Sequence, residues 1–318
     1  MKYVVFFSII VTFVMCFGFL FPVLAEETFI PSWIKNTAKF WSNGDIGDSE
    51  FIAAIQYLIQ NNILILESDK KDGFIKIDGE LFTLFYREDA MKNPFTIGAQ
   101  TTIHSPVFFA FDKKNESIYP EIKNDDDDVV VIFPSFTLSA YTEPGFYTYY
   151  RNECDEKCLT VEINHNLEAN YPSSNVGVTI LALLGYDVIT DIDVDRNPSI
   201  LDKYKKIILL HNEYVTKKIF DAITNHPKVI YLYPNSLYAL VDVNYQTNSI
   251  TLINGHGFPS KEIDNGFNWE FDNTRPDEFN TECNDWKFNE ISNGIQLNCY
   301  PENVLFKDYE LLKKIKDY

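Results

Sequence analysis

The sequence predicts an α/β fold in which helices flank a parallel sheet, preceded by a small β-rich region and an N-terminal αα-hairpin. Between residues 158 and 243, short β-branched runs alternate with segments of helical periodicity, as in parallel strands joined by crossover helices. The runs Ile207–Leu210 and Val229–Leu232 are apolar without alternation, which indicates strands covered on both faces. We therefore divide the chain into residues 1–25, 28–66, 70–150 and 151–318.

Residues 1–25 have the features of a secretory signal peptide. One lysine precedes an apolar run from Tyr3 to Leu24, and Val23 and Ala25 are the small residues of a cleavage site. The run is also long enough to span a bilayer if it stays uncleaved. We therefore expect an exported protein, extracellular or at the cell surface, that is either released or held on the membrane by this segment.

The composition limits the class of partner. The formal net charge is −19 and the chain has no basic patch, which excludes nucleic acid. The 26 Phe and 19 Tyr residues suit well-packed β-rich domains or surfaces that stack on sugar rings. A glycan or a peptide at the cell surface is the expected partner, and no cofactor is expected unless the acidic residues bind calcium.

Residues 28–66 predict two short helices that form an αα-hairpin. Pro31 suits the first turn of the first helix, and Trp41 lies on its apolar face. The patterns I-P-x-W-I-K-N-x-A-x-x-W, from Ile30, and G-x-I-x-D-x-x-F, from Gly44, resemble a module of exported proteins from ammonia-oxidising archaea. This resemblance implies a location in the cell envelope and carries no chemistry.

Residues 70–150 predict a small, mostly antiparallel β region. The runs GFIKIDGELFTLFYR, NPFTIGAQTTI, SPVFFAFD and VVVIFPSFTLSAYT are β-type and are separated by clusters of Gly, Pro, Asn and Lys. Asp78-Gly79 is a hairpin signal. Asn115, in Asn115-Glu116-Ser117, is an N-glycosylation acceptor between two of these strands and predicts an exposed turn.

The last part predicts the parallel sheet and a covering of hairpins. Four strands are expected at residues 158–163, 186–190, 206–210 and 228–233, with helices at 174–184 and 215–225. A hairpin at 240–253, a second hairpin closer to the C-terminus and a terminal helix at 304–316 follow.

The order and spacing of these elements resemble the class I glutamine amidotransferase-like fold, which includes catalytically silent relatives. The resemblance implies a nucleophilic cysteine on a tight elbow after the strand at 228–233. The elbow here has Ser236 and neither cysteine nor flanking glycine, so the thiol chemistry of that family is not expected. Ser236 as a replacement nucleophile, with His256 or His211 as its base, would instead predict a serine-type hydrolase or amidase.

A ligand crevice is expected beyond the carboxyl ends of the parallel strands, where open α/β sheets bind their ligands. The polar candidates for ligand binding that follow the predicted strands are His165, Asn166, His211, Asn212, Glu213 and Asn235. The alternative is that these residues cap the starts of loops and helices.

A calcium site is a further hypothesis. Asp191, Asp193, Asp195 and Asp202 match positions 1, 3, 5 and 12 of a calcium loop. Arg196 occupies position 6, where such loops need glycine, so a solvated acidic loop is the alternative. A calcium site here would indicate a calcium-dependent surface adhesion protein.

Four cysteines follow the signal segment and predict two local disulfides. An even number of cysteines in an exported chain favours the pairs Cys154–Cys158 and Cys283–Cys299. A zinc site built from all four thiolates is the alternative, although neither pair has Cys-x-x-Cys spacing. Together with the missing thiol nucleophile, these features make a non-catalytic binding or structural module of the cell envelope the leading hypothesis, with the serine hydrolase as the alternative.

Overall fold

The structure is a computed structural model. It describes residue 41 and residues 74–87, 95–97, 100–102, 107–165, 171–269 and 277–318. The expected signal segment at residues 1–25 lies outside this part of the chain, as does the expected hairpin at 28–66 apart from the helical residue Trp41. Among the helices that the structure describes, none combines the length and the apolar character needed to cross a membrane.

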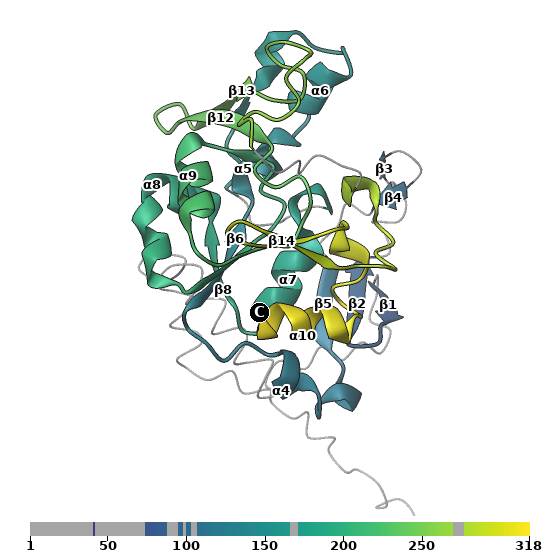
Figure 1. Cartoon of the computed structure of the whole chain (residues 1–318). Coiled ribbons are helices and arrows are strands. Elements are labelled where there is room, and N and C mark those ends of the chain that lie inside the picture. The colour runs from purple at the N-terminus through teal and green to yellow at the C-terminus, as the bar shows by residue number, and fades with distance from the viewer. Residues whose placement is uncertain are drawn as a thin grey trace, which may run out of the picture.

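A six-stranded sheet forms the centre of the molecule, with spatial order β14-β15-β11-β9-β6-β8 (Figure 1). Five of its strands are parallel, and β14 runs antiparallel to β15. Numbered along the chain, the parallel strands lie in the order 2-1-3-4-5, which is a doubly wound arrangement. The strands are β6 (Val129–Phe133), β8 (Asp187–Thr190), β9 (Lys206–Leu209), β11 (Val229–Tyr231), β14 (Phe288–Ile291) and β15 (Gly294–Leu297).

Helices cover both faces of this sheet, as the continuous apolar strands predict. Alternate residues of β6 point to opposite sides, so Val129 and Val131 belong to one buried core, and Val130 and Ile132 belong to the other. The first core contains α7 (Asn175–Leu183) and α10 (Tyr309–Asp317). The second core contains α5 (Ser135–Ala140), α8 (Asp191–Arg196) and α9 (Lys217–Asn225). The prediction of a parallel sheet with flanking helices is confirmed.

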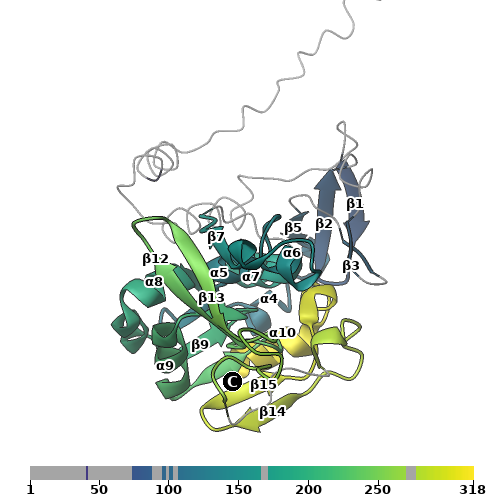
Figure 2. The ribbon, with the colours of Figure 1, turned by 90° about the horizontal axis from the view of Figure 1, so that it is seen from above.

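A four-stranded sheet packs on the side of α8 and α9 (Figure 2). Its spatial order is β10-β12-β13-β7, with β10 parallel to β12 and the other pairs antiparallel. The prediction that residues 158–163 form the first strand of the parallel sheet is therefore wrong, because that segment contains β7 of this second sheet. The strands are β7 (Thr160–Glu162), β10 (Tyr214–Val215), β12 (Ala239–Asn244) and β13 (Ser249–Asn254).

The β-rich region is smaller than the sequence predicts. A three-stranded antiparallel sheet, β1-β2-β5, packs on the side of α7 and α10, and a separate pair, β3-β4, is also antiparallel. The expected hairpin at Asp78-Gly79 joins β1 to β2. The run VVVIF, assigned from sequence to this region, is β6 of the central sheet, so the region ends before it. The strands are β1 (Phe74–Asp78), β2 (Phe82–Arg87), β3 (Phe95–Ile97), β4 (Gln100–Thr102) and β5 (Val107–Phe111).

Short helices connect these sheets. The helix α4 (Tyr119–Ile122) leads into β6, and α6 (Phe146–Tyr150) follows α5. Asn115 ends a 3-10 turn beside exposed Glu116 and Ser117, in agreement with the predicted exposed turn.

Both predicted disulfides are present. Cys154–Cys158 closes a loop just before β7, and Cys283–Cys299 ties a loop to the chain after β15, with sequence separations of 4 and 16. Disulfides persist in oxidising compartments, so both bonds are consistent with export.

Candidate functional site

The carboxyl ends of β6 and β9 lie side by side at the point where the winding of the sheet reverses. In doubly wound folds, this point is where ligands bind. The chain after β6 enters α5, and the chain after β9 continues as Leu210, His211, Asn212 and Glu213 before β10. The sequence therefore placed His211, Asn212 and Glu213 correctly at the carboxyl edge.

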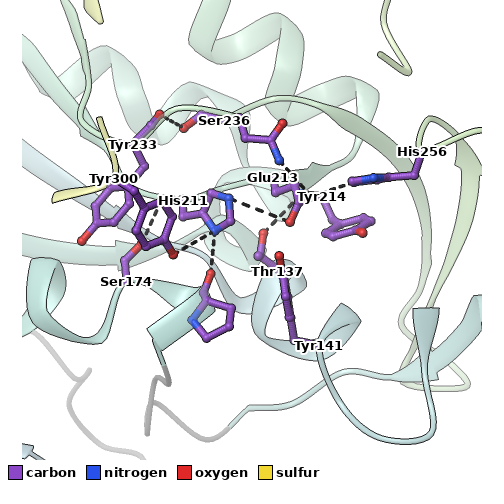
Figure 3. A network of polar contacts seen from close by, with 12 residues as sticks. Thr137, Tyr141, Ser174, His211, Glu213, Tyr214, Tyr233, Ser236, His256 and Tyr300 are labelled. Atoms are coloured by element: carbon purple, nitrogen blue, oxygen red, sulfur yellow. Dashed lines mark hydrogen bonds and ion pairs between the residues drawn. The ribbon is translucent and has the colours of Figure 1, made fainter. Parts of the chain in front are cut away.

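Glu213 forms the centre of a buried polar network at this edge (Figure 3). Its carbonyl oxygen accepts hydrogen bonds from the backbone N–H groups of Tyr238 and Ala239, at 3.0 and 2.9 Å, which fix it beside the start of β12. Its carboxylate atom Oε1 accepts from His256 Nε2 at 2.6 Å and from Asn235 Nδ2 at 3.1 Å. The carboxylate is fully buried, so these donors replace the water that it would otherwise bind.

His256 reaches Glu213 from a tight loop that follows β13. Gly255, His256 and Gly257 all have positive φ angles, of 119°, 52° and 75°, and the two glycines adopt this conformation without a side-chain clash. The backbone N–H of His256 donates to Asp264 O at 2.9 Å, which holds the loop closed. The His256 side chain is 20% exposed, whereas Glu213 is completely buried, so His256 separates the carboxylate from solvent.

Aromatic rings surround His256. The ring of Tyr238 lies edge-on at 4.5 Å between centroids, Tyr150 lies at 5.1 Å, and Tyr214 stacks at 5.4 Å. The hydroxyl of Tyr147 lies 3.4 Å from Glu213 Oε1. We define the tyrosine–histidine face as the partly exposed side chains of Tyr141, Tyr147, Tyr150 and His256.

His211 approaches Glu213 from the opposite side to His256. Its Nδ1 atom lies 2.6 Å from the carbonyl oxygen of Pro172, and its backbone N–H donates to Ser174 Oγ at 2.9 Å. Its Nε2 atom lies 3.9 Å from Glu213 Oε2. The three side chains thus form an array in which one carboxylate lies between two imidazoles.

The electrostatic environment keeps this carboxylate ionised. Burial by itself raises the pKa of Glu213, but the charge and hydrogen bond of His256, together with His211 and Tyr141, outweigh burial and hold the pKa below its usual value. Burial lowers the pKa of His211 despite the attraction of Glu213. Burial and the charge of Glu213 raise the pKa of Tyr147 well above its usual value, so its hydroxyl keeps its proton.

Ser236, the candidate nucleophile, lies after β11 but is engaged elsewhere. The side chain is fully buried, and its hydroxyl lies 2.8 Å from the carbonyl oxygens of both Leu210 and Tyr233. A carbonyl oxygen only accepts, so the hydroxyl proton points to the backbone. His256 pairs with Glu213 and His211 Nδ1 with a backbone carbonyl, so these bonds do not form the nucleophile–base pair that the hydrolase alternative requires.

The other ligand candidates are dispersed. Asn235 joins the network through Glu213, and Asn212 Nδ2 donates to Asp191 Oδ2 at 3.4 Å. His165 follows β7 of the second sheet, where its exposed ring bonds Asn248 Oδ1 at 2.6 Å. The prediction that His165 lies at the carboxyl edge of the parallel sheet is therefore wrong. Asn166 lies outside the described residues.

The acidic segment proposed as a calcium loop forms the helix α8 and the 3-10 helix Pro198–Lys203 instead. The first residue of α8, buried Asp191, accepts from the N–H groups of Ser135 and Phe136 at 3.0 and 3.1 Å. Asp193 and Thr190 cap the start of α8: the Asp193 N–H donates to the Thr190 hydroxyl, which donates to the Asp193 carboxylate. Buried Asp195 accepts from the hydroxyls of Thr216 and Tyr245 at 2.6 and 2.8 Å, whereas Asp202 is exposed. In the part of the chain that the structure describes, no three His, Cys, Asp or Glu side chains are grouped to hold a metal.

Sequence reasoning missed the tyrosines of the face and a second buried carboxylate. Tyr141 and Tyr147 follow β6 and α5, in a segment assigned from sequence to the antiparallel β region. Glu302 accepts from the N–H groups of Val176 and Gly177 at 3.0 and 3.1 Å and from the hydroxyl of Tyr233. The sequence matches no protein-family model, and no curated protein is a significant match to it.

Proposed function

We propose that this protein is an exported cell-envelope protein whose α/β unit is a non-catalytic binding module, related to the amidotransferase-like fold. The parallel sheet with helices on both faces supports the relationship, and the disulfides support export. The state of Ser236 carries the non-catalytic assignment. Its buried hydroxyl is bonded to backbone carbonyls, while His256 is bonded to Glu213.

The tyrosine–histidine face is the proposed ligand surface, and a glycan is the proposed ligand. The rings of Tyr141 and Tyr147 stack with centroids 4.2 Å apart, which gives a rigid pair held by a 2.6 Å hydrogen bond between their hydroxyls. Tyrosine contributes a large contact area at a low cost in conformational entropy. Pyranose rings present C–H groups that pack on such rings, and Glu213 and His256 supply polar groups beside them.

Covalent labelling tests the absence of serine catalysis. The full chain and its Ser236→Ala variant are treated with a fluorophosphonate probe, which reacts with activated serines. We expect equal labelling of the two proteins, because the Ser236 hydroxyl is bonded to carbonyl oxygens. Labelling that disappears in Ser236→Ala would establish the hydrolase or amidase alternative and refute our proposal.

Direct titration tests the ligand surface. Binding of tetrasaccharides to the full chain is measured by calorimetry, with Tyr147→Ala as the test variant and Phe279→Ala as the control. Phe279 is 74% exposed on a separate turn, so its loss controls for non-specific stacking on aromatic rings. We expect binding to weaken with Tyr147→Ala and to persist with Phe279→Ala. Equal effects of the two substitutions would rule out this face as the binding surface.

A further inference from the structure

Three buried polar atoms of the network lack hydrogen-bond partners among the residues that the structure describes: His211 Nε2, Glu213 Oε2 and Asn235 Oδ1. In this part of the chain, neither His211 Nε2 nor Glu213 Oε2 has a partner, although their side chains are only 2% and 0% exposed. The atoms lie 3.9 Å apart, which is beyond hydrogen-bond distance. Burying a polar atom without a partner costs free energy, so this pair requires an explanation.

The protonation state of His211 determines what the pair needs. His211 Nδ1 lies 2.6 Å from the carbonyl oxygen of Pro172, and because that oxygen only accepts, Nδ1 carries a proton. Burial lowers the pKa of His211, which favours the neutral ring. In the neutral ring with Nδ1 protonated, Nε2 presents a lone pair. Nε2 and the carboxylate atom Oε2 are therefore two acceptors that face each other and need a donor between them.

The surroundings favour a donor with a positive charge. Glu213 is ionised, and its ion-pair partners among the described residues are the histidines His211 and His256. The rings of Tyr300, Tyr233 and Tyr141 lie around His211, at 5.2, 6.2 and 6.5 Å between centroids. Tyrosine ring faces attract cations, and the net charge of −19 attracts cationic ligands from a distance.

We propose that His211 and Glu213 bind the protonated primary amine of an amino sugar, with the sugar ring against the tyrosine–histidine face. This inference rests on the proposed glycan binding and names the group that is recognised. The ammonium donates one hydrogen bond to His211 Nε2 and one to Glu213 Oε2. The face borders the pair, because the ring of Tyr141 lies 6.5 Å from the ring of His211 between centroids and the hydroxyl of Tyr147 lies 3.4 Å from Glu213 Oε1.

A matched pair of sugars tests the inference. The full chain is titrated by calorimetry with the tetramer of β-1,4-glucosamine and with the N-acetylated tetramer, which differs only in lacking the free amines. We expect the glucosamine tetramer to bind at least about tenfold more tightly, because it alone makes charge-assisted hydrogen bonds to the carboxylate. Equal affinities would overturn the amine inference but leave glycan binding intact, so the two failures are distinguishable.

Variants and a peptide probe complete the test. Glu213→Gln keeps the shape of the side chain and removes its charge, so the preference for the amine should disappear. Glu302→Gln, which changes another fully buried carboxylate, should keep the preference. A preference that survives in Glu213→Gln would overturn the inference. A free-amine tetrapeptide that binds when neither sugar does would overturn the amino-sugar assignment, and no binding of any probe would overturn both proposals.

Discussion

Glu302 should make the stability of this protein depend on pH, and replacing it with glutamine should remove that part of the dependence. Burial raises the pKa of Glu302 from 4.5 to about 7, against the opposing hydrogen bonds of Tyr233, Val176 and Gly177. The folded protein therefore retains a proton that the unfolded chain releases at lower pH. The resulting stabilisation is fully present below about pH 4.5 and is lost as the pH rises through about 7.

The pKa change sets the size of the effect. At 1.36 kcal/mol for each pH unit, a rise from 4.5 to about 7 corresponds to about 3 kcal/mol of unfolding free energy. Glutamine has nearly the same shape but does not titrate. Its single amide oxygen can accept from one of the two N–H groups, of Val176 or of Gly177, and the loss of the other bond is the same at every pH. The stability of wild type relative to Glu302→Gln should therefore decrease by about 3 kcal/mol between pH 4 and pH 8.

Urea denaturation followed by tryptophan fluorescence measures this difference at a series of pH values. Glu80→Gln is the control, because Glu80 is exposed and its replacement should leave the pH dependence of wild type unchanged. If the difference between wild type and Glu302→Gln is the same at every pH, or grows in favour of wild type as the pH rises, Glu302 does not have the raised pKa assigned to it.

Three further substitutions or additions test other parts of the structure by urea or thermal denaturation. Gly177→Ala would place a methyl group 2.3 Å from the Tyr233 hydroxyl, so the free energy of unfolding should fall by about 1–3 kcal/mol. Tyr233→Phe should restore part of this loss. No loss would mean that the packing there is looser than described. Cys299→Ser should cost about 3 kcal/mol through loss of the bond to Cys283, whereas an unchanged midpoint would show that the bond is dispensable. Calcium should leave the melting temperature unchanged, because Asp191 and its neighbours bond within the protein; a rise would revive the calcium hypothesis.

The strands and helices of the central sheet were readable where local signals agree. The runs Ile207–Leu210 and Val229–Leu232 are continuously apolar, and the structure shows β9 and β11 buried along their whole length. Thr216 indicates the start of α9, where its hydroxyl accepts from the N–H of Ile219. The disulfides were also predictable, because each joins cysteines close in sequence.

The first strand of the sheet was assigned wrongly because the membership of a strand in a sheet depends on distant partners. The segment Thr160–Glu162 is β-branched but alternates exposed, buried and exposed residues, as a strand with one covered face does. Val129–Phe133 is buried throughout, as a central parallel strand is. The rule that identified β9 and β11 also distinguishes these two segments. The β-type runs just before residue 129 favoured an antiparallel region, and Val129–Phe133 was therefore grouped with them.

The candidate site was predictable only in part. His211, Glu213 and Asn235 were found because they directly follow strands of the central sheet. The misassignment of β6 removed Tyr141 and Tyr147 from consideration. The same kind of local signal could have corrected the calcium hypothesis, because Thr190 and Asp193 have the spacing of a capping box and therefore indicate the start of a helix.

The carboxylates of Asp191 and Glu302 have a consequence for the kind of ligand that this fold can accept. The first N–H groups of a helix at the carboxyl edge of a doubly wound sheet commonly hold the phosphate of a nucleotide. Here Asp191 takes those of α5 and Glu302 takes those of α7, so both positions are already occupied by a carboxyl group supplied by the chain itself. A nucleotide approaching this edge would meet carboxyl side chains at positions where other doubly wound proteins offer unoccupied N–H groups. The scaffold therefore discriminates against phosphorylated metabolites.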